Sequence, residues 1–118
     1  MTRIESREKW NRSGVRVVAG LTYRYQAAGH WKDWYLECDA DGYSNVFMGL
    51  VGWTKRVPGA KWFQLIGVVD QDMRYVLRLG REGTFTAPAS GELWAFANDA
   101  GIAYWNNSGA VELQVQEV

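Results

Sequence analysis

Oxygen-bearing side chains gather in one short segment near the carboxyl end of the chain. The segment holds one carboxylate, three carboxamides and a serine hydroxyl, on Asp99, Asn98, Asn106, Asn107 and Ser108. Ca²⁺ binds several oxygen ligands in flexible geometry, and side chains of these types provide them. Hydroxyl groups of a ligand can then fill the coordination positions that the protein leaves open. The segment therefore predicts a calcium site that binds a sugar.

The backbone of this segment must leave extended geometry for the site to form. Consecutive residues of a regular strand point to opposite faces, so Asn106 and Asn107 reach one ion only if the chain bends there. Gly101 permits a tight return, and the Ser108-Gly109 step helps the bend. The same composition also suits an Asn/Asp-rich turn held by its own side-chain to backbone hydrogen bonds. Spacing by itself leaves both interpretations open.

The rest of the chain indicates the strands that position this segment. Strand-like runs occupy residues 15–18, 21–27, 62–69, 75–79, 84–87, 92–97 and 110–116. In the last run Val111, Leu113 and Val115 alternate with polar residues, which is typical of a half-buried strand. Many short strands with frequent turn signals predict an all-β fold, a jelly-roll-like β-sandwich that forms a single domain over residues 1–118.

Three stretches lack this periodicity. Asp70-Gln71-Asp72 predicts a hairpin turn between two strands. Residues 30–60 contain many turn signals and predict a long irregular region, which in a compact domain is usually functional. Residues 2–12 predict at most one helical turn.

Composition limits the classes of function. Thirteen basic and thirteen acidic side chains cancel, so no electrostatic surface for nucleic acid or an anionic membrane is expected. No apolar run approaches membrane-spanning length, and the first residues lack the apolar core of a signal peptide. We therefore expect a cytoplasmic protein, or one released without a signal peptide. Seven tryptophans suit either a small β core or the apolar C–H faces of sugar rings.

Residues with catalytic potential do not form a recognisable set. His30 lies near Asp33 in the sequence, and Cys38 is the only cysteine. These residues do not provide a nucleophile, a base and a group that orients the base. A glycosidase needs two carboxylates that face each other across a cleft, and no such pair can be placed. The protein is therefore expected not to be an enzyme.

The carboxyl-terminal motif resembles a known family. Asn98-Asp99 followed by Tyr104-x-Asn106-Asn107-Ser108-Gly109, between the last two strands, is similar to the PA-IL-type (LecA-like) galactose-binding lectins of bacteria. Residues 14–29, with two Ala-Gly steps, resemble the first strand pair of that family. The resemblance implies a small galactose-binding-domain-like jelly roll with one Ca²⁺ at its end. It also implies that the ion joins the protein to two adjacent sugar hydroxyls.

The resemblance also implies a ligand set. Asp99 supplies a carboxylate, Asn106 and Asn107 supply side-chain oxygens, and Ala103 occupies a position where the family uses its main-chain carbonyl. Asp33 stands where the family uses a backbone carbonyl, and here it can add its own carboxylate. The candidate contacts to sugar, in this case a galactoside or related glycan, are Asp99, Asn106, Asp33, Trp53, Trp105 and His30.

The chain departs from the family in the middle loop, where the family reads galactose with His and Gln side chains. This chain has Gly49-Leu50-Val51-Gly52-Trp53 instead, so no residue can be assigned to a hexose 6-hydroxyl. Calcium binding is therefore better supported than a preference for galactose. Modest affinity at one site makes a homo-oligomer plausible, because multivalency compensates for it. The alternative is a protein-interaction or accessory sandwich that binds no metal.

Overall fold

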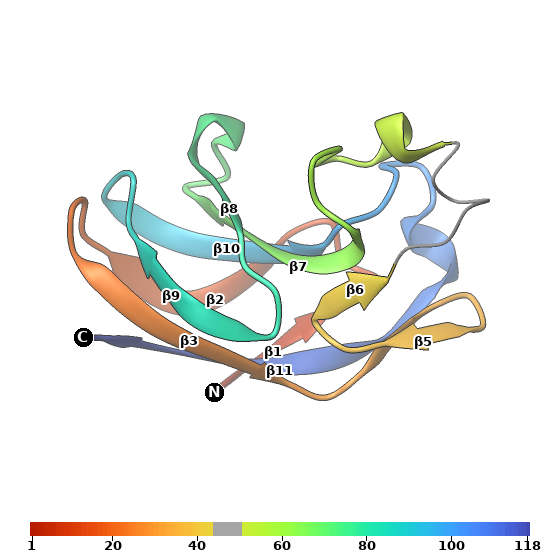
Figure 1. Ribbon diagram of the computed structural model, residues 1–118, viewed down its shortest axis with the longest axis horizontal. Helices are drawn as coiled ribbons and strands as arrows, with labels where there is room; N and C mark the ends of the chain where they lie inside the picture. The colour runs from red at the N-terminus through yellow and green to blue at the C-terminus, as the bar shows by residue number, and fades with distance from the viewer. Residues whose placement is uncertain (44–50) are drawn as a thin grey trace.

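The computed structural model describes residues 1–43 and 51–118, which form a β-sandwich of two antiparallel sheets (Figure 1). The first sheet has the order β5 (Leu36–Cys38), β4 (Trp31–Asp33), β11 (Asn107–Glu117), β3 (Thr22–Ala28) and β9 (Glu82–Thr86), and β1 (Thr2–Glu5) also pairs with β11. The second has the order β2 (Asn11–Val17), β10 (Gly91–Ala97), β7 (Trp62–Val69) and β6 (Asp41–Tyr43), and β8 (Val76–Arg78) pairs with β7. Short 3₁₀ helices are η1 (Gly52–Thr54), η2 (Met73–Tyr75) and η3 (Tyr104–Asn106). The predicted all-β sandwich is confirmed.

Alternation along the strands builds the core between the two sheets. Tyr23, Tyr25 and Ala27 of β3 are buried while the residues between them are exposed. Two of the alternating positions of β11, Val111 and Leu113, are buried in the same way. Trp31 and Phe63, from opposite sheets, are fully buried in this core and meet edge to face at 6.0 Å between ring centroids.

Two sequence expectations about local structure were wrong. Residues 2–12 contain β1 and the start of β2 instead of a helical turn, because Asn11 accepts from the Glu5 N–H at 2.9 Å and donates to the Ala95 carbonyl at 3.1 Å. Residues 30–60 contain β4, β5 and β6 instead of a wholly irregular region. Each of these strands has three residues, which is too short to show a period of two in the sequence.

Strand β11 connects the core to one end of the sandwich. It begins at Asn107, earlier than predicted, and its first residues pair with β4 while its later residues pair with β3. The two ladders share one register, because Ala28 pairs with Glu112 and Trp31 pairs with Gly109. Strand β4 therefore continues the line of β3 along β11, and the β4–β5 hairpin, η1 and η3 lie at the same end of the molecule (Figure 1).

The hairpin turn predicted at residues 70–72 is confirmed. It joins β7 to the antiparallel β8 through η2, and the Asp72 N–H donates to the Val69 carbonyl at 3.0 Å. Asp70 and Gln71 have φ angles of +54° and +58°, the left-handed values that a tight turn of this type requires.

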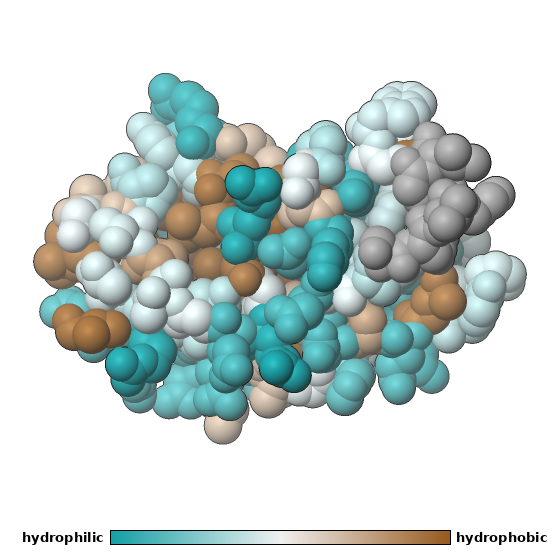
Figure 2. All heavy atoms as spheres, in the orientation of Figure 1, coloured by the Kyte–Doolittle hydropathy of each residue, from teal (hydrophilic) through white to brown (hydrophobic). Residues whose placement is uncertain are grey.

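The surface is unevenly apolar. On the face shown in Figure 2, hydrophilic residues cover the lower part over β1, β3 and β11, and hydrophobic residues gather around β8, β9 and β10. Tyr75, Leu77 and Leu79 are partly buried against the core in that region. In the described residues no helix has the length and apolar character needed to cross a lipid bilayer.

Candidate functional site

The predicted oxygen ligands meet at the end of the sandwich where β4, β10 and β11 terminate or begin. Asp99 follows β10, Asn106 ends η3, and Asn107 begins β11 opposite Asp33 of β4. The Trp34 N–H donates to the Asn106 carbonyl at 3.2 Å and ties the β4–β5 hairpin to η3. The change from 3₁₀ helix at Asn106 to extended backbone at Asn107, with φ −83° and ψ 150°, is the predicted bend.

Three oxygen atoms in this region are buried without a hydrogen-bond partner. They are Oδ2 of Asp99, Oδ1 of Asn106 and Oδ1 of Asn107. Asp99 and Asn107 are each 2% exposed, so these oxygens are shielded from bulk solvent. A buried acceptor left unsatisfied costs about 1–3 kcal/mol. No other side-chain nitrogen or oxygen of residues 1–43 and 51–118 is buried and unpaired, so the cost is confined to the predicted site.

Hydrogen bonds to the opposite ends of these side chains set their orientation. The Asn107 Nδ2 donates to the Ser6 carbonyl at 2.9 Å, which leaves its Oδ1 free. The Asp99 Oδ1 accepts from the Ala100 N–H at 2.7 Å, and its Oδ2 remains unpaired. The Ser6 hydroxyl donates to the Ser108 carbonyl at 2.8 Å and holds the start of β11. The amino-terminal turn therefore helps to position a site formed near the carboxyl terminus.

The site concentrates negative charge. Asp33 is 9% exposed, and its Oδ2 accepts from the Tyr43 hydroxyl at 2.6 Å. The pKa of Asp99 is raised from 3.8 to about 6, mainly by burial and then by the charge of Asp33. Hydrogen bonding from the Ala100 N–H and from the Asn107 side chain lowers the pKa of Asp99 and offsets part of this rise. Two carboxylates close enough to repel one another favour a bound cation.

Asn98 has the same side chain as Asn106 and Asn107 but a structural role, so residue type alone did not distinguish it from the candidate ligands. It is fully buried, and its Oδ1 accepts from the Val57 N–H at 3.0 Å. Its Nδ2 donates to the Val57 carbonyl at 2.9 Å and to the Lys61 carbonyl at 3.0 Å. Asn98 therefore holds the segment that follows η1, while its neighbour Asp99 keeps an oxygen free.

Arg56 links the same segment to the site. Its backbone N–H donates to the Asp99 carbonyl at 3.0 Å, and its Nη1 donates to the Tyr104 hydroxyl at 3.0 Å. Its guanidinium carbon lies 3.5 Å from the centroid of the Phe96 ring, within the range of a cation–π contact. The sequence carried no signal for this role, because the partners lie 40 or more residues away.

The remaining predicted site residues lie on different elements, and only some of these elements adjoin the oxygen cluster. Ala103 directly precedes η3, and its N–H donates to the Ala100 carbonyl at 2.9 Å, so it belongs to the Asp99–Asn106 loop. Trp53 on η1 and Trp105 on η3 are 78% and 73% exposed. His30 precedes β4 and lines a separate hollow with Asp39 and Arg81. Residues 49 and 50 of the middle loop lie outside the described residues.

Two exposed aromatic residues beside the cluster were missed. Trp34 and Tyr35, at the tip of the β4–β5 hairpin, are 71% and 70% exposed. Their rings meet edge to face at 4.8 Å between centroids. The signal in the sequence was an aromatic pair inside a region that was expected to be irregular.

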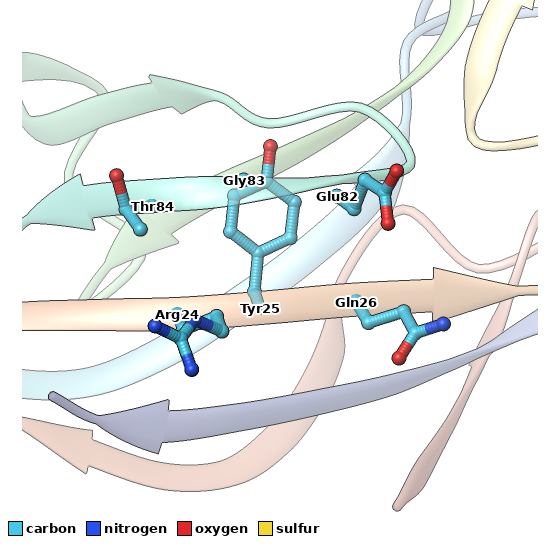
Figure 3. Close-up of a pocket in the computed structure, with 6 residues that line it drawn as sticks. All are labelled: Arg24, Tyr25, Gln26, Glu82, Gly83 and Thr84. Carbon is cyan, nitrogen blue, oxygen red and sulfur yellow. The ribbon is translucent and has the colours of Figure 1, made fainter.

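Another hollow lies over β3 and β9, away from the cluster. Figure 3 shows the Tyr25 ring standing over Gly83, between Arg24 and Gln26 on one strand and Glu82 and Thr84 on the other. The Tyr25 hydroxyl donates to the Leu79 carbonyl, so its donor is already used. This hollow contains no unpaired buried group among the described residues.

The donor set at the cluster fits Ca²⁺ in its chemistry. Carboxylate, carboxamide and carbonyl oxygens suit hard cations, whereas zinc and copper prefer imidazole and thiolate. Within the part of the chain that the structure describes, no three residues of the types His, Cys, Asp and Glu are grouped as a metal site. The ligands available at the cluster are instead two carboxylates and two carboxamides, of Asp33, Asp99, Asn106 and Asn107.

Comparisons with known proteins give a similarity in structure and none in sequence. No protein-family model matches the sequence, and no curated protein matches it. Among solved structures, the chain is similar to one described as "EclA N-terminal domain; PllA-like lectin", with a TM-score of 0.75 and 16% identity. The match covers 99% of this chain and 94% of that one. At this identity the similarity shows that the two chains share a fold.

Proposed function

We propose that this protein is a lectin that binds carbohydrate through a calcium ion. The observation that carries the proposal is the group of three unpaired buried oxygens on Asp99, Asn106 and Asn107. A fold that leaves three acceptors unsatisfied in one loop loses stability unless a cation occupies the site. The description of the structural neighbour as a lectin supports the carbohydrate-binding class.

The proposed ligands of the ion are the free oxygens of Asp99, Asn106 and Asn107, the carbonyl of Ala103 and the carboxylate of Asp33. When bound, Ca²⁺ supplies open coordination positions for two adjacent sugar hydroxyls. In this proposal, side-chain oxygens of Asp99, Asn106 and Asp33 accept hydrogen bonds from those hydroxyls.

Trp105 is exposed next to Asn106 on η3, and Trp53 is exposed on η1 at the same end of the sandwich (Figure 1). We assign both rings to the apolar face of the sugar. His30 lines another hollow, so we leave it outside the primary contacts. The type of sugar rests on the family resemblance, which favours a galactose-type glycan. The mechanism is binding and orientation, with no covalent step.

We also propose that several such sites act together in a homo-oligomer. One sugar bound at an exposed edge buries few atoms, so its affinity is modest. Several sites on a homo-oligomer raise the overall avidity through effective concentration.

A competing function is protein binding without metal. The exposed rings of Trp34, Tyr35, Trp53 and Trp105 favour it, because aromatic residues are enriched at protein interfaces. The unpaired oxygens oppose it, because a protein partner would have to supply three buried donors at one point.

Thermal unfolding and a glycan array distinguish the two functions. A calcium-dependent lectin gains thermal stability when Ca²⁺ is added and loses that gain when EDTA is added. The array, run with Ca²⁺ and with EDTA, should show glycan binding in the first condition only. A melting temperature that responds to neither reagent, together with an empty array, would refute the proposed function.

A further inference from the structure

The β4–β5 hairpin carries a tryptophan in an unfavourable backbone conformation. Trp34 is the first residue of the two-residue connection between Asp33 and Leu36, and its φ angle is +55°. Glycine adopts this left-handed conformation freely, whereas a bulky L-residue rarely does. Its side chain is 71% exposed, so burial in the core does not compensate for the strain.

The strained residue lies directly beside the oxygen cluster. Its N–H donates to the Asn106 carbonyl at 3.2 Å, and the preceding residue, Asp33, pairs with Asn107. The ring contact that the structure shows for Trp34 is with Tyr35, which is itself 70% exposed. The hairpin therefore presents two aromatic rings next to the site, and both remain in contact with solvent.

The two-residue turn between Asp33 and Leu36 requires a left-handed residue at position 34, and glycine, asparagine or aspartate usually supplies it. The turn geometry therefore explains the φ angle of Trp34 but not the choice of an exposed tryptophan at this position. Strained backbone persists where the side chain has a function, and Trp and Tyr are the residues that most often dominate binding surfaces. The hairpin also carries Lys32 and Glu37, which are exposed and face one another in register. A ligand at this position meets flat apolar rings with charged groups beside them, which matches the C–H faces and rim hydroxyls of a sugar.

We propose that Trp34 and Tyr35 form a second carbohydrate subsite, which binds the sugar residue linked to the one held at the calcium site. This inference rests on the proposed function and extends it, because it makes an oligosaccharide the preferred ligand. Trp34 supplies the face on which the second ring stacks, and Tyr35 holds the indole in position through their edge-to-face contact.

Isothermal titration calorimetry of the calcium-loaded protein with methyl α-galactoside, lactose and melibiose tests the subsite. The wild type should bind at least one of the two disaccharides about tenfold more tightly than methyl α-galactoside, as one additional aromatic contact predicts. Trp34→Gly should reduce that disaccharide to the affinity of methyl α-galactoside. The variant should keep its affinity for methyl α-galactoside and for Ca²⁺, and its melting temperature should equal or exceed that of the wild type.

Gln71→Gly is the matched control. Gln71 also has a positive φ, +58°, and is exposed in the β7–β8 turn, so glycine relieves the same backbone strain without removing an aromatic ring. The control should bind all three sugars like the wild type.

The outcomes separate this inference from the proposed function. A wild type that binds none of the three sugars in Ca²⁺ refutes the galactose-binding function, and the subsite with it. A wild type that binds all three equally, or a Trp34→Gly variant that loses the monosaccharide equally, refutes the subsite alone. Phenyl β-galactoside, titrated as a fourth ligand, carries an apolar ring in place of a second sugar. A gain in affinity for it but for neither disaccharide refutes the carbohydrate subsite and indicates a site for an apolar substituent. A Trp34→Gly variant that changes oligomeric state assigns the rings to contact with a second copy of the chain.

Discussion

Replacing Asp99 with asparagine should separate the metal site from the fold. The substitution keeps the shape of the side chain and removes its charge. In the folded, metal-free protein the pKa of Asp99 is raised from 3.8 to about 6, first by burial and then by Asp33. A raised carboxylate pKa means that the folded state holds the proton more tightly than the unfolded state. The charged form therefore destabilises the fold, by about 2–3 kcal/mol near neutral pH.

Asp99→Asn should remove that penalty. In EDTA near neutral pH, urea titration should show the variant to be more stable than the wild type by up to this amount. Ca²⁺ at about a hundred times its dissociation constant should stabilise the wild type by about 2.7 kcal/mol and the variant hardly at all. Calorimetric titration should show that the variant has lost both calcium binding and calcium-dependent sugar binding.

A variant that is less stable than the wild type in EDTA would show that Asp99 supports the fold. A variant that still gains stability from Ca²⁺ would show that the ion binds elsewhere. Glu8→Gln is the control, because it removes an exposed carboxylate from the turn between β1 and β2 and should leave both measurements unchanged.

Three further predictions concern the surroundings of the site. The metal-free wild type should lose stability in urea titrations as the pH rises from about 4 to about 7, because Asp99 releases its proton at a pKa of about 6, and saturating Ca²⁺ should abolish this loss. Asn98→Ala should lower the free energy of unfolding by about 3 kcal/mol, because it leaves buried backbone groups of residues 57–61 without hydrogen-bond partners. A loss below about 1 kcal/mol in chemical denaturation would contradict this structural role. Arg56→Ala should lower it by about 2 kcal/mol through loss of the Phe96 stacking and the Tyr104 hydrogen bond, whereas Arg56→Lys should retain part of the stability in the same assay.

Strand periodicity predicted the parts of the fold that are long enough to show it. The runs at 21–27, 62–69 and 92–97 correspond closely to β3, β7 and β10. Strands β4, β5 and β6 were not predicted because three residues cannot display alternation. Strand β1 was missed because its pairing with β11 depends on residues more than a hundred positions away.

The candidate site was predicted in its composition and not in its surroundings. Asp99, Asn106 and Asn107 attracted notice because their side chains carry the oxygens that a hard cation binds. Asn98 has the same chemistry and a different role, and only its burial among residues 57–61 reveals this. Trp34 escaped notice because backbone strain is invisible in a sequence.

The sequence by itself determined which atoms are available, because residue type decides donors and acceptors, and the period of apolar residues decides which strands face a core. Tertiary structure decided which oxygens remain unpaired. The Ser6 carbonyl accepts from the Asn107 side chain although the two residues lie far apart in the sequence. The β4–β5 hairpin brings a second carboxylate and two aromatic rings to the same edge. The physical reason is that a polar atom can bind a ligand only if it has no hydrogen-bond partner within the protein. The partners of each atom are fixed only when the whole chain has folded.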